Sequence, residues 1–160
     1  IGANFVILGH SEMRHNGDTN KIINKKIKSA IQSKLKVILC IGESHVQKRN
    51  NKTLNILKSQ ILNCLKNIKI SKNIFIAYEP VWSIGTGNTL SNEELAKIIK
   101  KIKYICYKKF KKNVKIFYGG SVNPKNITNL KKNQLIDGFL VGSASRSSNK
   151  FIDIINKSIN

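Results

Sequence analysis

Acidic residues are scarce in this sequence, and no cysteines or histidines have the spacing typical of disulfides or metal sites. The chain contains eight aspartate and glutamate residues but 29 lysine and arginine residues. The three cysteines, Cys40, Cys64 and Cys106, are odd in number, far apart and set in apolar patterns. This excludes a disulfide framework and a CxxC pair, and it indicates buried thiols in a reducing cytoplasm. The histidines have no ligand spacing with cysteine or acidic residues, so we expect no metal, and nothing predicts a cofactor.

Long apolar runs and a secretory signal pattern are also missing. No stretch of about 18 uninterrupted apolar residues occurs, so we expect no membrane-spanning segment and no membrane partner. The 160 residues contain 41% apolar residues, which is enough for a sizeable core. We therefore expect a single domain over residues 1–160.

The net charge of +21 is typical of a nucleic-acid-binding protein. However, lysine, isoleucine and asparagine supply 26, 26 and 20 residues while alanine supplies 5, a skew that indicates compositional drift. The positive residues are mostly lysines, spread from Lys21 to Lys157 over what would be solvated helix faces. We therefore expect no nucleic-acid partner, although a positive field would attract an anionic substrate.

Five continuously apolar runs predict parallel strands that are covered on both faces. Helical stripes lie between and after them, and the clearest one begins at a predicted capping box over 91–94. The chain thus contains five consecutive βα units, which fit either an open doubly wound sheet or part of a (β/α)8 barrel. The predicted strands are Phe5–Leu8, Val37–Ile41, Ile74–Tyr78, Val114–Tyr118 and Phe139–Val141.

Polar residues or glycines follow every predicted strand, and this favours the barrel. Barrel enzymes build their sites at the carboxyl ends of the strands. Glycines follow the fourth and fifth strands, where bare backbone N–H groups commonly hold a phosphate. The segments are Gly9-His10-Ser11-Glu12, Gly42-Glu43-Ser44-His45, Glu79-Pro80, Gly119-Gly120-Ser121 and Gly142-Ser143-Ala144-Ser145.

The third strand ends on Glu79, and Pro80 stops it. The next residues are apolar at first and then read Gly-Thr-Gly, which is typical of a segment that is rigid at one end and flexible at the other. A carboxylate at the tip of a buried strand, beneath a loop able to close, suits a general base shielded from water. Strand, glutamate and proline alone fit a turn-capping carboxylate equally well.

Five segments match the pattern of one enzyme family in order. They are Val6 through Glu12, Cys40-Ile41-Gly42-Glu43, Ala77 through Gly87, Tyr118 through Val122 and Asp137 through Gly142. On these segments the sequence resembles triosephosphate isomerase, and Glu-Pro-Val-Trp-Ser-Ile-Gly-Thr-Gly is highly specific. The resemblance covers essentially all 160 residues and implies a partial TIM (β/α)8 barrel, with five consecutive βα units corresponding to units 4–8.

The resemblance implies roles for particular residues. Glu79 would move a proton between C1 and C2 of a triose phosphate, interconverting dihydroxyacetone phosphate and D-glyceraldehyde 3-phosphate in glycolysis and gluconeogenesis. His10 would polarise the carbonyl as a neutral imidazole, and this family is itself the standard example of a histidine kept neutral by a helix N-terminus. Residues 80–88 would form a lid that excludes water. The implied phosphate-contacting positions are Gly85, Ser121, Gly142 and Ser143.

Supporting roles follow from the same resemblance. Ser11 would hold the base in the open state, and Glu12 would pair with a lysine of the family's first strand. We interpret Glu43 as a scaffold residue and His45 as a residue of a surface loop. A histidine such as His10, considered alone, is more often a structural residue. Its position after a strand-ending glycine favours a catalytic role only when Glu79 is considered as well.

The sequence departs from the family pattern in three ways. Ser143 stands where a second glycine is usual, so its Cβ is expected to crowd the anion or strain the backbone. Met13 stands where an arginine is usual, which would remove an ion pair near His10. The first three βα units, with their lysine, asparagine and dimer-forming loop, have no counterpart. We therefore interpret the sequence as incomplete and expect little isomerase activity from this chain alone. A homodimer is expected for full-length members of the family.

Two other functions remain open at this stage. One is a different phosphate-binding βα barrel, which would use another general base. The other is a non-catalytic module of the same fold that binds phosphate or nucleic acid.

Overall fold

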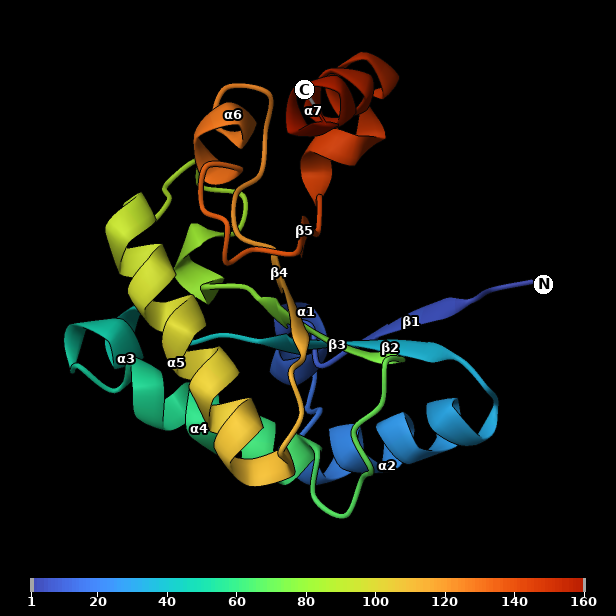
Figure 1. The fold of residues 1–160 in the computed structure, drawn as a ribbon. Coiled ribbons are helices and arrows are strands. Elements are labelled where there is room, and N and C mark those ends of the chain that lie inside the picture. Colours follow the sequence, from blue (N-terminus) through green and yellow to red (C-terminus); the bar gives the residue numbers. More distant parts are fainter. Residues whose placement is uncertain (1, 160) are drawn as a thin grey trace.

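The computed structural model describes residues 2–159 and contains one five-stranded sheet (Figure 1). The strands are parallel and pair in chain order, β1-β2-β3-β4-β5. The predicted α/β fold of consecutive βα units is therefore confirmed. The strands are β1 (Phe5–Leu8), β2 (Lys36–Ile41), β3 (Ile74–Tyr78), β4 (Lys115–Tyr118) and β5 (Gly138–Phe139).

Helices connect successive strands and follow the last one. The longest, α5, begins where the Ser91 side chain accepts a hydrogen bond from the Glu94 backbone N–H, and it ends at Lys111 in the left-handed conformation. The α-helices are α1 (Ser11–His15), α2 (Asn20–Gln32), α3 (His45–Arg49), α4 (Thr53–Cys64), α5 (Asn92–Phe110), α6 (Ile127–Leu130) and α7 (Ser148–Ile159). Two 3₁₀ turns, η1 (Val81–Ser83) and η2 (Ser143–Arg146), follow β3 and β5.

Three local predictions were wrong in detail. The fifth strand covers only Gly138–Phe139 and not Phe139–Val141, because its ladder pairs two residues with β4 alone. The helix predicted from Asn123 begins at Ile127, since the Asn123 side chain instead accepts the backbone N–H groups of Lys125 and Asn126 in a turn. His45 is exposed as predicted, but it is the first residue of α3 and not a loop residue.

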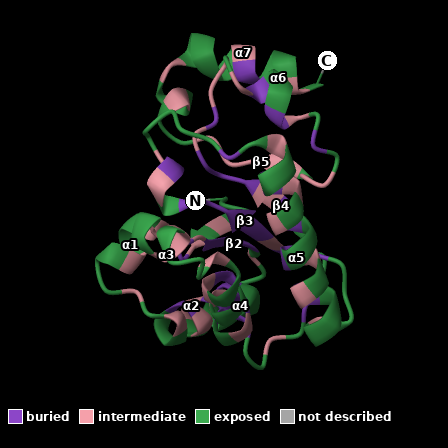
Figure 2. Cartoon of the chain, turned by 90° about the vertical axis from the view of Figure 1, so that its left-hand side faces the viewer, coloured by how far each residue is buried: buried purple, intermediate pink, exposed green. Residues whose placement is uncertain are grey.

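The sheet has a helix-covered outer face and a less covered inner face. Alternate residues of β2 and β3 point outward into the main core, which includes Leu39, Ile41, Ile76 and Tyr78. Their neighbours point inward and form a smaller cluster of Ile38, Cys40 and Ala77. Figure 2 shows the buried residues of β2 and β3 at the centre and exposed residues over the helices.

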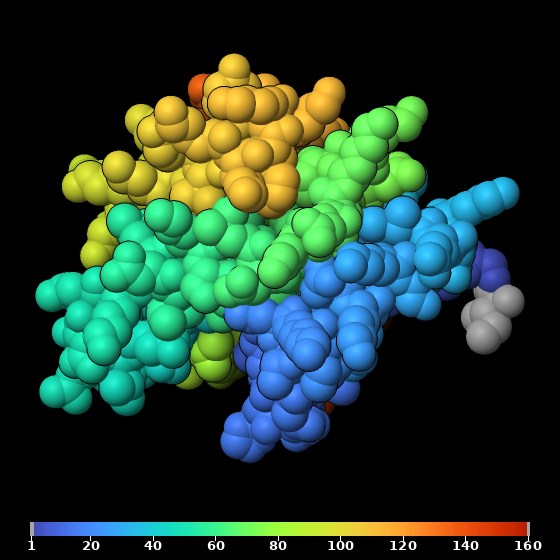
Figure 3. All heavy atoms as spheres, turned by 90° about the horizontal axis from the view of Figure 1, so that it is seen from below, coloured from blue at the N-terminus to red at the C-terminus, as the bar shows by residue number. Residues whose placement is uncertain are grey.

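Helices α2, α4 and α5 lie side by side over the outer face, as the view from below in Figure 3 shows (blue, teal and yellow to orange). Each turns an apolar stripe inward: Ile23 and Ile27 of α2, Ile61 of α4, and Ile99 and Ile102 of α5 are fully buried. Their lysines remain outside. Within residues 2–159, no helix combines the length and the hydropathy needed to cross a membrane.

Candidate active site

A cavity of about 270 Å³ lies at the carboxyl ends of the strands. Ile7, Ile84 and Leu140 supply part of its apolar lining. Two predicted supporting residues, Ser11 and Glu12, do not line it. The predicted residues that do are His10, Glu79, Gly85, Ser121, Gly142 and Ser143.

Glu79 directly follows β3 on its inward-pointing side and is only 4% exposed. Its carboxyl group lies against the backbone of Gly119, the first residue after β4. A Cβ built at Gly119 would lie 2.6 Å from Glu79 Cγ, so a glycine is required for this approach. One carboxyl oxygen, Oε2, is buried without a hydrogen-bond partner among the described residues.

Burial sets the acid–base character of Glu79. It raises the pKa of the carboxyl above its ordinary value, while a hydrogen bond with the Cys40 thiol and the nearby His10 lower it. Burial also raises the pKa of Cys40, and the Glu79 charge raises it further. The thiol therefore stays protonated and can donate a hydrogen bond. The result is a carboxylate that is a stronger base than one in water, which is typical of a general base.

His10 is half-buried and precedes α1 as its N-cap. Its Nδ1 accepts the backbone N–H of Glu12 at 3.4 Å, a contact that fits the imidazole tautomer with its proton on Nε2. The α1 helix begins at Ser11, directly after His10. Gly9 permits this chain reversal with φ +77°, where a Cβ would lie 3.0 Å from the Cys40 carbonyl oxygen.

The opposite part of the cavity is lined largely by backbone. Gly119, Gly120 and Ser121 follow β4, Gly142 precedes η2, and Ser143 is the first residue of η2. Glycines allow an anion to approach backbone N–H groups closely, so this region could hold a phosphate. Ser143 is not among the residues with positive φ, and the strain expected of its Cβ is absent.

The segment over residues 80–88 passes close to the cavity, to which it contributes Ile84 and Gly85. Ser83 fixes the segment by two hydrogen bonds. Its hydroxyl donates to the Asn88 carbonyl oxygen and accepts the Ser121 backbone N–H at 3.2 Å. Gly85 and Gly87 both have positive φ, at +72° and +80°. This end of the segment therefore uses conformations that other residues rarely adopt.

The other end of the segment is held by a polar cluster on the outer face. Glu43 is 1% exposed and accepts hydrogen bonds from the Tyr78 hydroxyl and, at 2.9 Å, from Trp82 Nε1. Burial, followed by the Glu43 charge, raises the pKa of Tyr78, so its hydroxyl remains a donor. Lys48 Nζ lies 3.8 Å from the centroid of the Trp82 ring. Glu43 is thus an anchor for Trp82 as well as a scaffold residue.

Sequence reasoning missed Arg14, which joins the ends of β1 and β2. Its guanidinium donates to the carbonyl oxygens of Gly9 at 2.7 Å and of Cys40 at 3.2 Å, and to Asn20 Oδ1 at 2.8 Å. A guanidinium thus remains beside the chain reversal at His10, while Met13 is 45% exposed. No sequence pattern signals these contacts, because the Gly9 and Cys40 acceptors are backbone atoms.

Within residues 2–159, no three histidine, cysteine, aspartate or glutamate side chains are grouped as metal ligands would be. The absence of a cofactor stays a prediction. The chemistry available in the cavity is proton transfer by a carboxylate, hydrogen-bond donation by an imidazole, and anion binding by backbone N–H groups.

Comparison with known proteins gives one consistent result. The family model described as triosephosphate isomerase matches residues 1–158. The triosephosphate isomerase of Mycoplasmopsis pulmonis is 46% identical over 156 residues, and that of Alkaliphilus oremlandii is 42% identical over 163 residues. These alignments cover 97% and 98% of this chain but 61% and 66% of the relatives.

A solved structure gives the same answer. The crystal structure of triosephosphate isomerase from Bartonella henselae superimposes with a TM-score of 0.89 at 30% sequence identity, covering 99% of this chain and 65% of that one. The predicted partial TIM barrel is confirmed by this likeness, and the matches favour an isomerase over a nucleic-acid-binding module. The chain belongs to the triosephosphate isomerase family.

Proposed function

We propose that this chain carries the proton-transfer machinery for interconverting dihydroxyacetone phosphate and D-glyceraldehyde 3-phosphate. One observation carries the proposal: a buried carboxylate, Glu79, and an imidazole, His10, line one cavity with the glycines after β4 and β5. The chain spans about two thirds or less of the length of the curated relatives it matches, so the activity of the whole protein is part of the proposal.

The proposed reaction begins with the substrate phosphate on the backbone N–H groups near Gly85, Ser121, Gly142 and Ser143. Glu79 takes a proton from C1 of dihydroxyacetone phosphate; the C1–H electron pair forms a C1–C2 double bond, and charge moves to the carbonyl oxygen. His10 donates its Nε2–H to that oxygen and stabilises the charge. The O1 hydroxyl proton then moves to that oxygen through His10, and return of the first proton from Glu79 to C2 leaves an aldehyde at C1 and a hydroxyl at C2.

Water exclusion is the proposed role of residues 80–88. A closed lid strengthens the electrostatic interactions of the buried carboxylate and protects the enediolate from side reactions. We assign Ser11 and Glu12 only supporting roles, because neither lines the cavity in this structure. A cytoplasmic location fits the three buried free cysteines, and a homodimer remains a prediction for the full-length family.

The test is hydrogen exchange at C1 of dihydroxyacetone phosphate in D₂O, followed by proton NMR with the 160-residue chain. The resemblance places a substrate-binding lysine outside the matched units, so we expect exchange far slower than in a complete enzyme. Glu79→Gln should lower the exchange rate by roughly 10²–10⁴, the usual contribution of a general base. The exposed Glu93→Gln on α5 should leave it unchanged.

Each outcome has a defined meaning. Measurable exchange at equal rates by the chain and by Glu79→Gln would contradict the base assignment. Exchange and turnover at the rate of a complete enzyme would instead contradict the expectation that this chain alone is nearly inactive.

A further inference from the structure

A second and larger cavity, of about 750 Å³, lies between α4 and α5 on the outer side of the sheet. We call it the α4–α5 groove. Leu54 of α4 and Ile98 of α5 line it together with the buried Leu90, and Leu54 is 41% exposed. This volume and apolar lining are typical of sites that hold a small organic molecule.

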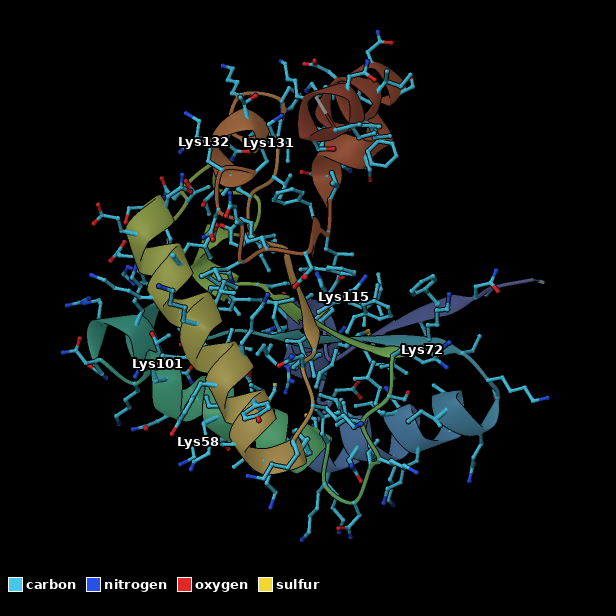
Figure 4. All side chains as sticks on the ribbon, in the orientation of Figure 1. Lys58, Lys72, Lys101, Lys115, Lys131 and Lys132 are labelled. Atoms are coloured by element: carbon cyan, nitrogen blue, oxygen red, sulfur yellow. The ribbon has the colours of Figure 1, made fainter. Side chains whose placement is uncertain are left out.

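Lysines surround this apolar lining. Lys48, Lys97 and Lys101 line the groove, and none of them forms an ion pair among residues 2–159. Figure 4 labels Lys101 on α5 and Lys58 on the neighbouring α4. Among the described residues, the groove therefore has lysine ammonium groups without a carboxylate partner beside apolar side chains.

Two acidic residues also line the groove, and both are already engaged. Glu43 accepts hydrogen bonds from Tyr78 and Trp82. Glu94 accepts one from the Ser91 hydroxyl at 3.4 Å. Three lysines facing two hydrogen-bonded carboxylates favour an anionic occupant over a cationic one.

The groove is also connected to the segment over residues 80–88. Lys48 lies over the Trp82 ring, and Glu43 accepts the Trp82 indole N–H. Lys48 and Glu43, which both contact the Trp82 side chain, therefore also line the groove. A negative group bound among the lysines would attract Lys48 away from the ring, because an ion pair competes with a cation–π contact.

We propose that the α4–α5 groove binds small organic anions that carry an apolar body. The anionic group lies among Lys48, Lys97 and Lys101, and the apolar body packs on Leu54, Leu90 and Ile98. Binding draws Lys48 from the Trp82 ring and so loosens the proline end of the 80–88 segment. This site is separate from the cavity that holds Glu79, and its binding step does not depend on isomerase activity.

The experiment is an NMR titration of the ¹⁵N- and methyl-labelled chain with 4-phenylbutyrate. Because the chain has one tryptophan, the Trp82 indole N–H gives a single side-chain resonance of its type. Saturable shifts are expected at Trp82 and at the methyl groups of Leu54 and Ile98. Acetate, which lacks the apolar body, and 4-phenylbutan-1-ol, which lacks the charge, should each bind about tenfold more weakly or worse.

Matched variants locate the site. Lys97→Glu/Lys101→Glu should weaken binding about tenfold, whereas Lys72→Glu, in the exposed segment before β3 and outside the groove (Figure 4), should change it less than about twofold. In Lys48→Met the Leu54 and Ile98 shifts should persist while the Trp82 shift is largely lost.

Several results would overturn the proposal. Absence of saturable binding, equal binding of the alcohol, or shifts confined to inner-face residues such as Phe5 and Ile7 would each do so. If the double variant does not fold, the salt dependence of 4-phenylbutyrate binding to the wild type tests the lysine contacts instead. The affinity should fall at high ionic strength, and a constant affinity would contradict those contacts. A Trp82 shift that survives in Lys48→Met would remove the link to the 80–88 segment.

Discussion

The two faces of the sheet differ in how completely they are covered. On the outer face, Leu39, Ile76 and Tyr78 pack under α2, α4 and α5 with no exposed surface. On the inner face, Phe5 and Ile7 of β1 are 45% and 48% exposed. The apolar cluster there is small, although Phe75 stacks on Phe117 with ring centroids 5.3 Å apart. The same strands therefore have one face built for stability and one that is only partly closed.

The candidate chemistry is divided in the same way. Successive residues of a strand point to opposite faces, so Tyr78 joins the outer cluster and Glu79 enters the inner cavity. The outer carboxylate, Glu43, receives two donors, whereas Glu79 keeps one buried oxygen without a partner. A base needs this lack of partners, because hydrogen bonds to its charged form would weaken its attraction for a proton.

The largest expected difference is in packing energy. Ile76→Ala on the outer face should lower the free energy of unfolding by about 2–5 kcal/mol, since Ile76 is fully buried and its loss leaves a cavity. Ile7→Ala should cost about 1 kcal/mol or less, because half of that side chain is exposed. Urea denaturation measures both, and equal losses would contradict the contrast between the two faces.

A methyl group at the inner face tests the placement of the base. Gly119→Ala puts a Cβ against the Glu79 side chain and should move the carboxylate, lowering C1 hydrogen exchange by about 10²-fold. Binding of inorganic phosphate serves as the control and should persist, because Gly142 and Ser143 are unchanged. Undiminished exchange would mean that the observed position of Glu79 is not needed.

The smallest expected effect is on the pH dependence of stability. The raised pKa of Glu79 means that the folded state binds the proton more tightly than the unfolded state does. Glu79 therefore lowers stability as pH rises from the ordinary carboxyl pKa through the raised one. Glu79→Gln should remove this decline, making the variant more stable than the wild type at neutral pH but not at acid pH.

Urea denaturation between about pH 4 and pH 8 measures this difference. The exposed Glu93→Gln is the control and should keep the wild-type slope. Parallel pH profiles for the wild type and Glu79→Gln would contradict the effect of burial on Glu79.

Local patterns predicted much of the fold. Apolar runs located β1 and β3 at their observed bounds and β2 and β4 to within one residue, because short β-branched and aromatic runs fit buried strands. They failed at β5, where pairing with one neighbour fixes the bounds. They also failed at α6, where an asparagine side chain made a turn in place of a helix start.

By itself, the sequence determined the order of strands and helices, the candidate residues His10 and Glu79, and the glycines at the strand ends, because each is encoded by residue type and local spacing. Only the tertiary structure decided which groups meet. Arg14 with the Gly9 and Cys40 carbonyls, Glu43 with Tyr78 and Trp82, and the lysines of the α4–α5 groove come from separate elements. The degree of burial that raises the pKa of Glu79 was decided there too, because desolvation depends on every neighbour that displaces water.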